Sequence, residues 1–189
     1  GECAGVCALR RVESMDEMIA SVRLRALVRY WSDKCAGRPM APRMAIDPIE
    51  IPGILPIVLL ADATREGPRM RLLGTEATGA YGRETRGWLV QEIQFGEFDV
   101  SWQGAFNEVV RSARPAFAAG TYRRGTELCS VETALMPLTG DGSTVSQILG
   151  GLVIRPLAHD WVSEQERRRV ITIPRSDGFN GRRTEIRRL

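Results

Sequence analysis

The order in which strand-like and helical segments follow one another most constrains how this chain can fold. Residues 55–64 and 69–74 have the apolar or alternating pattern of strands, and a turn-like Arg-Glu-Gly-Pro segment joins them. Residues 116–123, 128–138 and 144–154 form a second group of strand-like runs. Because helical patterns lie between the two groups, the sequence predicts an α+β fold. Its sheet is antiparallel, with helices over one face, and the parallel βαβ arrangement is disfavoured.

The segment between the two strand groups contains one strong helix. Residues 98–113 carry apolar side chains at helical spacing, and Pro115 marks the end of this pattern. The apolar side of the predicted helix contains Phe98, Trp102, Phe106, Val109, Val110 and Ala113. Residues 75–89 are glycine-rich and indicate short helical turns. Further upstream, Asp47 before Pro48 is typical of a helix N-cap followed by proline at the first helical position.

An amphipathic helix is predicted over residues 12–34, with a left-handed cap at Gly37. Its apolar residues recur at steps of three and four: Met15, Met18, Ile19, Val22, Ala26 and Tyr30. Further apolar residues widen this stripe, namely Leu24, Leu27, Val28 and Trp31. A stripe of this width can be covered on two sides, by the chain's own domain and by a partner. We therefore expect a two-fold homodimer with an interface formed by Met15, Ile19, Val22, Ala26 and Tyr30.

The composition fits one globular domain with added ends. Hydrophobic residues make up 43% and charged residues 26% of the 189 residues. We divide the chain into a helix at 1–36, a central domain at 37–156 and a basic extension at 157–189. No apolar run approaches the roughly 20 residues of a membrane helix, and no secretory leader pattern is visible, so a cytoplasmic location is expected.

The four cysteines and the net charge indicate no special chemistry. Cys3, Cys7, Cys35 and Cys129 show no metal-ligand spacing and are interpreted as reduced thiols. A formal net charge of +3 is mild and does not by itself require a nucleic-acid partner.

A series of short motifs resembles the PAS domain family, and more narrowly a group of bacterial stand-alone single-PAS proteins. In chain order the motifs are Tyr30-Trp31, Arg38-Pro39, Pro42-Arg43, Ile46-Asp47-Pro48, Ile51-Pro52, Leu55-Pro56, Arg71-Leu72-Leu73-Gly74-Thr75, Tyr81-Gly82-Arg83, Gly87 and Met136-Pro137-Leu138. The resemblance spans roughly residues 30–154. It implies a five-stranded antiparallel sheet with spatial order 2-1-5-4-3, and helices that enclose a central cavity. The biochemical activity of such proteins is usually unassigned.

The sheet and the helix over it are expected to enclose an apolar pocket with a few polar groups. The candidate lining residues are Arg71, Leu73, Tyr81, Trp102, Phe106, Val110, Phe117 and Val131. The sheet and the middle helices are expected to bring Leu72, Phe106 and Val131 near this common interior. Alternatively, the same lining side chains simply fill the core. Arg71, Arg83 and Arg86 can meet an anionic ligand at the cavity mouth, or they belong to a solvated face with ion pairs.

Several chemistries known from PAS domains are not expected here. The helix at 98–113 has no histidine, so a haem ligated by histidine is disfavoured. Flavin-binding relatives use a Gly-Arg-Asn-Cys segment, whereas this chain has Gly82-Arg83-Glu84-Thr85, so a covalent flavin bond is not expected. The cofactor is left unknown. His159 lies beside Asp160 on one predicted loop, which cannot usually present a catalytic relay, and we expect no enzymatic activity.

The resemblance and the residues together predict a sensory or regulatory domain. It would bind a small ligand and signal to an unidentified protein by contact. One alternative is a ligand-free module for dimerisation or protein interaction. Another uses the basic tail, which contains Arg167, Arg168, Arg169, Arg182, Arg183, Arg187 and Arg188. Such a tail can bind nucleic acid by counterion release, but a solvated tail or an acidic protein partner is favoured.

Overall fold

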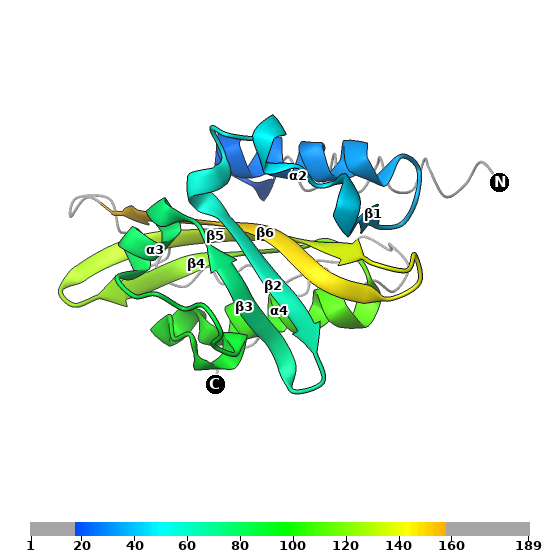
Figure 1. Cartoon of the computed structure of the whole chain (residues 1–189). Coiled ribbons are helices and arrows are strands. Elements are labelled where there is room, and N and C mark those ends of the chain that lie inside the picture. Colours follow the sequence, from blue (N-terminus) through cyan, green and yellow to red (C-terminus); the bar gives the residue numbers. More distant parts are fainter. Residues whose placement is uncertain (1–17, 158–189) are drawn as a thin grey trace, which may run out of the picture.

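A computed structural model describes residues 18–157 and contains a mixed α+β fold (Figure 1). The long strands are β2 (Val58–Thr64), β3 (Gly67–Leu73), β4 (Ala116–Arg124), β5 (Glu127–Thr139) and β6 (Val145–Pro156). The helices are α2 (Val22–Cys35), α3 (Thr75–Tyr81) and α4 (Asp99–Ser112). Two strands, then helices, then three strands follow in the predicted order, so the fold class is confirmed.

The long strands pair only in the antiparallel sense, in the order β3-β2-β6-β5-β4. Numbered along the chain, this is the expected order 2-1-5-4-3. The structure adds one feature that the sequence did not indicate. A two-residue strand, β1 (Ala41–Pro42), pairs in parallel with Leu138 and Thr139 at the end of β5. Two residues are too short to carry a recognisable strand pattern.

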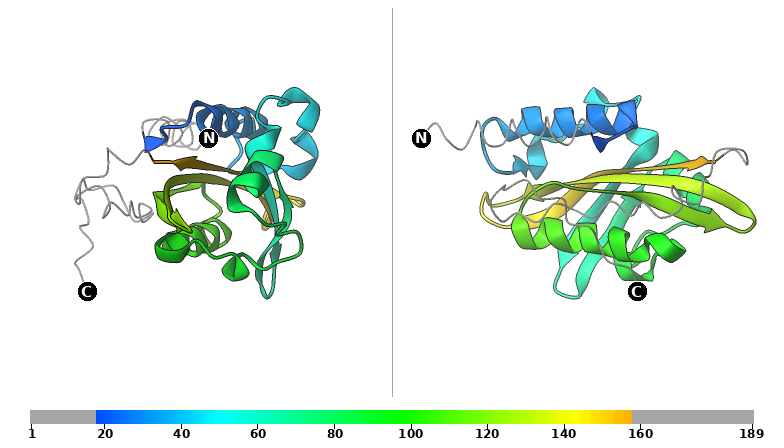
Figure 2. Two further views of the ribbon diagram at one scale, coloured as in Figure 1. Left: turned by 90° about the vertical axis from the view of Figure 1, so that its left-hand side faces the viewer. Right: turned by 180° about the vertical axis from the view of Figure 1, so that it is seen from behind.

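Apolar layers cover both faces of the sheet (Figure 2). On one face, α3 and α4 enclose an interior with the sheet, whereas α2 lies on the opposite face. The close approach of α2 depends on Gly151 of β6, because a Cβ atom there would lie 2.5 Å from Leu24 Cδ2. The N-terminal helix is therefore packed against its own domain, which is one of the two contacts predicted for its apolar stripe.

Short 3-10 turns connect the main elements. They are η1 (Arg43–Ala45), η2 (Pro48–Glu50), η3 (Leu55–Ile57), η4 (Val90–Glu92) and η5 (Gly96–Phe98). The predicted N-cap is confirmed, since Asp47 Oδ1 accepts a hydrogen bond of 2.9 Å from the N–H of Ile49. The predicted start of the first strand at residue 55 is wrong. Residues 55–57 form η3 instead, with Pro56 in the turn, and β2 begins at Val58.

The predicted continuous helix over residues 12–34 is wrong within its described part. Met18 is helical, Ile19, Ala20 and Ser21 are not, and α2 begins at Val22. At this break, the Glu132 side chain of β5 accepts hydrogen bonds from the N–H groups of Ala20 and Ser21. The predicted left-handed conformation at Gly37 is confirmed with a φ of 80°, and it already begins one residue earlier, at the C-cap Ala36, whose φ is 48°. Residues before Met18, including Met15, lie outside the described part of the chain.

The helix α4 ends where the sequence indicates, with Ala113 in the left-handed conformation shortly before Pro115. Its residues Phe98, Trp102, Phe106 and Val109 are buried as predicted. Val110 is not, since it is 40% exposed on the outer side of the helix.

Within residues 18–157, no helix is long and apolar enough to cross a membrane. Cys3, Cys7, His159 and residues 158–189 of the basic extension fall outside the described residues.

Candidate functional site

Aromatic rings fill the space between α4 and the sheet. Phe95 lies at the centre of this aromatic interior. Its ring centroid is 5.0 Å from that of Tyr81, 5.0 Å from that of Trp102 and 5.3 Å from that of Tyr122. Trp102 continues the series, 4.8 Å from Phe106. These are tilted or edge-to-face contacts, which aromatic rings prefer in packed cores. The structure therefore favours the filled-core alternative for this region.

The polar groups of the aromatic interior are mostly paired. The indole Nε1 of Trp102 donates to the carbonyl of Val90 at 3.3 Å, and the hydroxyl of Tyr81 accepts from the N–H of Gln94 at 3.2 Å. Burial raises the pKa of Tyr122, so this phenol stays neutral. Thr85 is fully buried, and its hydroxyl has no hydrogen-bond partner among the described residues. Leaving a buried hydroxyl without a hydrogen bond costs free energy.

The structure brings together most of the predicted cavity residues. Trp102, Phe106 and Val131 are buried in one cluster, against which Leu73 and Tyr81 pack while half-buried. Val110 points outward, as described above.

Phe117 lies in the other apolar layer, beneath α2. It alternates with Ala116 and Ala118, which face the aromatic interior, so the strand geometry directs it to the opposite face.

Arg71 and Leu72 are also outside the aromatic interior. Arg71 follows the buried Met70 in β3, and its guanidinium lies 3.3 Å from Asp62 in an exposed ion pair. Leu72 is 39% exposed, which corrects its expected place beside Phe106 and Val131. Arg83 and Arg86 follow α3 in the chain, and no described residue pairs with either side chain. The ion-pair alternative therefore holds for Arg71.

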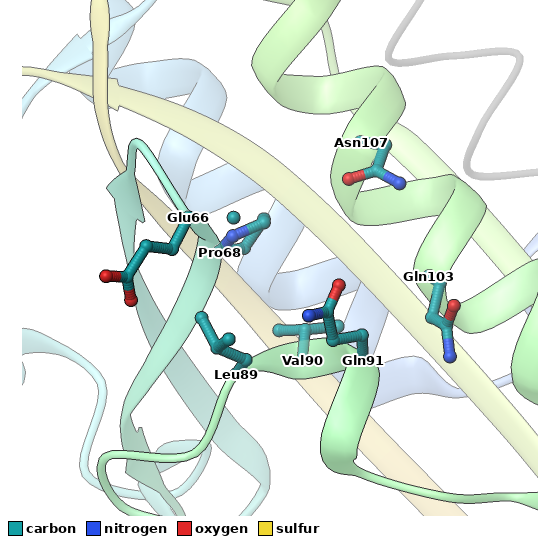
Figure 3. A pocket seen from close by; sticks show the side chains of 8 residues that line it. Glu66, Pro68, Leu89, Val90, Gln91, Gln103 and Asn107 are labelled. Carbon is teal, nitrogen blue, oxygen red and sulfur yellow. The ribbon is translucent and has the colours of Figure 1, made fainter.

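A surface groove of about 140 Å³ lies next to the aromatic interior. It is lined by Glu66, Gly67, Pro68, Leu89, Val90, Gln91, Gln103 and Asn107. Figure 3 shows Gln103 and Asn107 on α4 and Gln91 beside Val90, with Glu66 and Pro68 on the β2–β3 hairpin. Sequence reasoning missed this groove, because its residues come from three distant segments and share no motif.

The turn η4 separates the groove from the aromatic interior. Val90 lines the groove and is also buried in the interior cluster, where its carbonyl accepts from Trp102. The hydrogen bond from Trp102 stabilises the turn on its interior side. At the start of the turn, the side chain of Glu92 accepts a hydrogen bond from the N–H of Leu89 at 2.6 Å.

The helix α2 is tied to the sheet and to α3 by polar contacts. Glu132 of β5 accepts hydrogen bonds from the N–H groups of Ala20 and Ser21, each at 3.1 Å. Arg23 forms a two-pronged ion pair with Glu76 of α3, at 2.6 and 2.5 Å, which lowers the pKa of Glu76. The buried indole of Trp31 donates to the carbonyl of Pro137 at 2.9 Å.

The predicted dimer residues have different surroundings. Ile19 is 1% exposed and packs in the chain's own core, whereas Val22 is 68% exposed. Ala26 and Tyr30 are half-buried, and Tyr30 also hydrogen-bonds to Glu50 at 2.7 Å. In this arrangement Ile19 is not accessible to a second copy.

The family model described as PAS domain matches residues 19–153. This chain belongs to the PAS domain family. The match covers both helical layers and all five long strands, so the whole described fold is the PAS domain. The narrower bacterial stand-alone group and the cytoplasmic location stay predictions.

Solved structures of PAS and light-oxygen-voltage domains share parts of this fold at low identity. A light-oxygen-voltage domain studied with a flavin analogue is 10% identical over 60% of this chain and 85% of its own, with a TM-score of 0.48. The PAS domain of Bordetella pertussis BvgS is 16% identical over 59% and 84%, with a TM-score of 0.45. A Rhodobacter sphaeroides light-oxygen-voltage protein is 15% identical over 56% and 61%, with a TM-score of 0.44. Curated protein sequences gave no match.

The thiols in the described part of this PAS domain are buried. Cys35 is the last residue of α2 and is buried in the apolar layer on that side of the sheet, and Cys129 is buried in the aromatic interior. Burial raises the pKa of Cys35 to about 11 and also raises that of Cys129. Neither is a reactive thiolate at neutral pH. Among residues 18–157 no group of three His, Cys, Asp or Glu side chains is placed to hold a metal ion.

Proposed function

We propose that this PAS domain is a non-catalytic sensory or regulatory module. In this proposal a small ligand changes the packing of the aromatic interior, and α2 passes the change to a partner protein by contact. The observation that carries the proposal is the attachment of α2 to β5 and α3 through Glu132 and Glu76. Both elements enclose the aromatic interior, so a shift of either one moves a contact of α2.

The groove beside η4 supports a ligand that is small and forms hydrogen bonds through neutral groups. Gln91, Gln103 and Asn107 each carry a side-chain amide, which both donates and accepts, and no described residue hydrogen-bonds to these three amides. Pro68 and Leu89 supply apolar contact. We infer that the ligand binds first in the groove and reaches the interior when η4 moves away from Trp102.

Native mass spectrometry of the purified chain, followed by thermal-shift measurements against a metabolite panel, tests this function. Binding to the folded state raises the melting temperature in proportion to occupancy. We expect a retained mass or a thermal shift that Asn107→Ala reduces and the matched variant Gln94→Ala, outside the groove, leaves unchanged. No retained mass and no shift across the panel would contradict ligand sensing.

A ligand-free interaction module is the second candidate, and it is favoured by the filled interior and by exposed apolar residues. Met44 in η1 is 94% exposed and Ile49 in η2 is 85% exposed, although large apolar side chains are usually covered. Sedimentation of the chain at tens of micromolar distinguishes this candidate. We expect a homodimer that Val22→Asp or the pair Met44→Ser and Ile49→Ser weakens. A strict monomer would count against a role in dimerisation.

Nucleic-acid binding by the basic tail concerns residues outside the described part and stays the least favoured prediction.

A further inference from the structure

The local sequence explains the break between Met18 and Val22 only in part, through Ser21, which is a favourable N-cap residue for α2. Residues 12–34 contain neither proline nor glycine, and their apolar periodicity predicts an unbroken helix. Yet Ser21 has extended backbone angles, with φ −72° and ψ 118°, and its side chain caps α2 by accepting from the N–H of Leu24 at 3.4 Å. A contact from elsewhere in the fold must therefore favour the broken form.

The Glu132 carboxylate supplies that contact. Its two oxygens accept from the N–H groups of Ala20 and Ser21, which in a continuous helix would donate to the carbonyls four residues earlier. On the other side of the break, the Arg25 guanidinium donates to the carbonyls of Ile19 and Ala20. Charged groups thus satisfy both the donors and the acceptors that the break leaves open, and hydrogen bonds of this kind are stronger than neutral ones. The buried side chain of Ile19 adds apolar packing to the same arrangement.

We propose that Glu132 selects between two helical arrangements of this segment. With the contact made, the helix is broken at residues 19–21 and Ile19 is buried in the chain's own core. Without it, the segment continues as one helix through residues 19–21, and Ile19 lies on the same side of the helix as the exposed Val22 and the half-buried Tyr30. The two forms differ in the apolar surface offered to a second copy. Such a pair of states is what a population shift requires.

The place of Glu132 in β5 couples this choice to the aromatic interior. Val131 packs in the interior, and the next residue, Glu132, reaches α2 from the opposite face of the sheet. A change in packing around Val131 therefore moves the Glu132 carboxylate directly, because the two residues are neighbours in the chain. This coupling rests on the proposed sensory function. The helix break and its stabilisation by Glu132 do not depend on that function.

Carbon-13 chemical shifts of Ile19, Ala20 and Ser21 test the proposal, because Cα shifts report helical or extended backbone. Glutamine in Glu132→Gln has the same shape, but its NH₂ group cannot accept a hydrogen bond. We expect the Ser21 shift to change from extended to helical values in this variant. Glu76→Gln is the matched control, since it removes another carboxylate that contacts α2, and it should leave Ser21 extended. If Glu132→Gln fails to fold, Glu132→Asp is used, whose shorter carboxylate loses at least one of the two bonds and should give an intermediate shift.

A proline at Val22 separates the two arrangements directly. Val22 is the first residue of α2, where proline is tolerated, and the extended Ser21 before it suits a following proline. Inside a continuous helix the same proline removes a hydrogen bond and clashes with the preceding turn. We expect Val22→Pro alone to keep the fold and the extended shift of Ser21. The double variant with Glu132→Gln should restore the extended shift.

An extended Ser21 in folded Glu132→Gln, or unfolding of Val22→Pro, would overturn the proposal. If the domain binds no ligand, the proposed sensory function fails, but the expected Cα shifts of Ser21 in these variants are unchanged. The two failures are therefore distinguishable.

Discussion

The indole N–H of Trp102 is hydrogen-bonded at 3.3 Å to the carbonyl of Val90, the residue that lies between the surface groove and the aromatic interior. The largest buried side chain of this domain therefore holds the turn that closes its interior. A ligand that enters the interior must replace this hydrogen bond or the packing around it. The Trp102–Val90 contact is consequently the first place to test whether the interior is a core or a latent cavity.

Replacing Trp102 by alanine should destabilise the domain by about 3–5 kcal/mol in urea unfolding, because it removes a large side chain from a filled core. Added indole should raise the melting temperature of this variant and leave that of the original protein unchanged. Val110→Ala on the exposed side of α4 provides the control, with a cost below about 1 kcal/mol. A small loss for Trp102→Ala would show that the interior was already loosely packed.

Two glycines should respond to alanine in opposite directions. At Gly74 a Cβ atom would press on the carbonyl oxygens of Pro56 and Leu55, the latter at 2.5 Å, and backbone oxygens cannot rotate away. Gly74→Ala should therefore cost about 1–3 kcal/mol, as overpacking does. Gly104 lies within α4 with open space around it, so Gly104→Ala should stabilise by about 0.5–1 kcal/mol. The denaturant midpoints of Gly74→Ala and Gly104→Ala measure both changes in stability. Equal changes in the two variants would contradict the close packing at Gly74.

The ion pair between Arg23 and Glu76 should contribute at neutral pH and disappear in acid. The hydrogen bond from Arg23 lowers the pKa of Glu76 in the folded protein, so the stabilisation is complete above the unfolded value and is lost as the pH falls through the lower folded value. Both side chains are partly exposed, which limits the coupling to about 1 kcal/mol or less. A double-mutant cycle with Arg23→Gln and Glu76→Gln at pH 7 and near pH 3 measures it. Coupling that persists at the lower pH would contradict this account.

The buried thiols should resist alkylation until the domain unfolds. Because burial raises the pKa of both Cys35 and Cys129, little thiolate forms at pH 7.5 and access is restricted. Mass spectrometry after brief iodoacetamide treatment should show labelling of these two cysteines only in urea. Rapid labelling of Cys129 under native conditions would indicate that the aromatic interior opens.

How far the sequence predicts this protein depends on whether a feature is local. The order of elements along the chain, the helix α4 with its buried Trp102 and Phe106, and the Asp47 cap all follow from periodicity or from one or two neighbouring residues, whereas the spatial order of the strands was implied by the family resemblance. The face of the sheet on which Phe117 and Arg71 lie could not be predicted in the same way. That choice depends on where each strand enters the sheet, and a shift of one residue exchanges the two faces.

The sequence alone determined the α+β class and the order of strands and helices, because hydrophobic periods of two and 3.6 residues are properties of the chain itself, and the PAS architecture followed from the resemblance of its motifs to that family. Only the tertiary structure decided that the interior is filled by rings around Phe95, that a groove lies beside Val90, and that the N-terminal helix is broken. Each of these depends on groups far apart in the chain, such as Ser21 and Glu132, 111 residues apart. A local pattern contains no information about such a partner, and a pair of charge-assisted hydrogen bonds is strong enough to override a helical preference of a few tenths of a kcal/mol per residue.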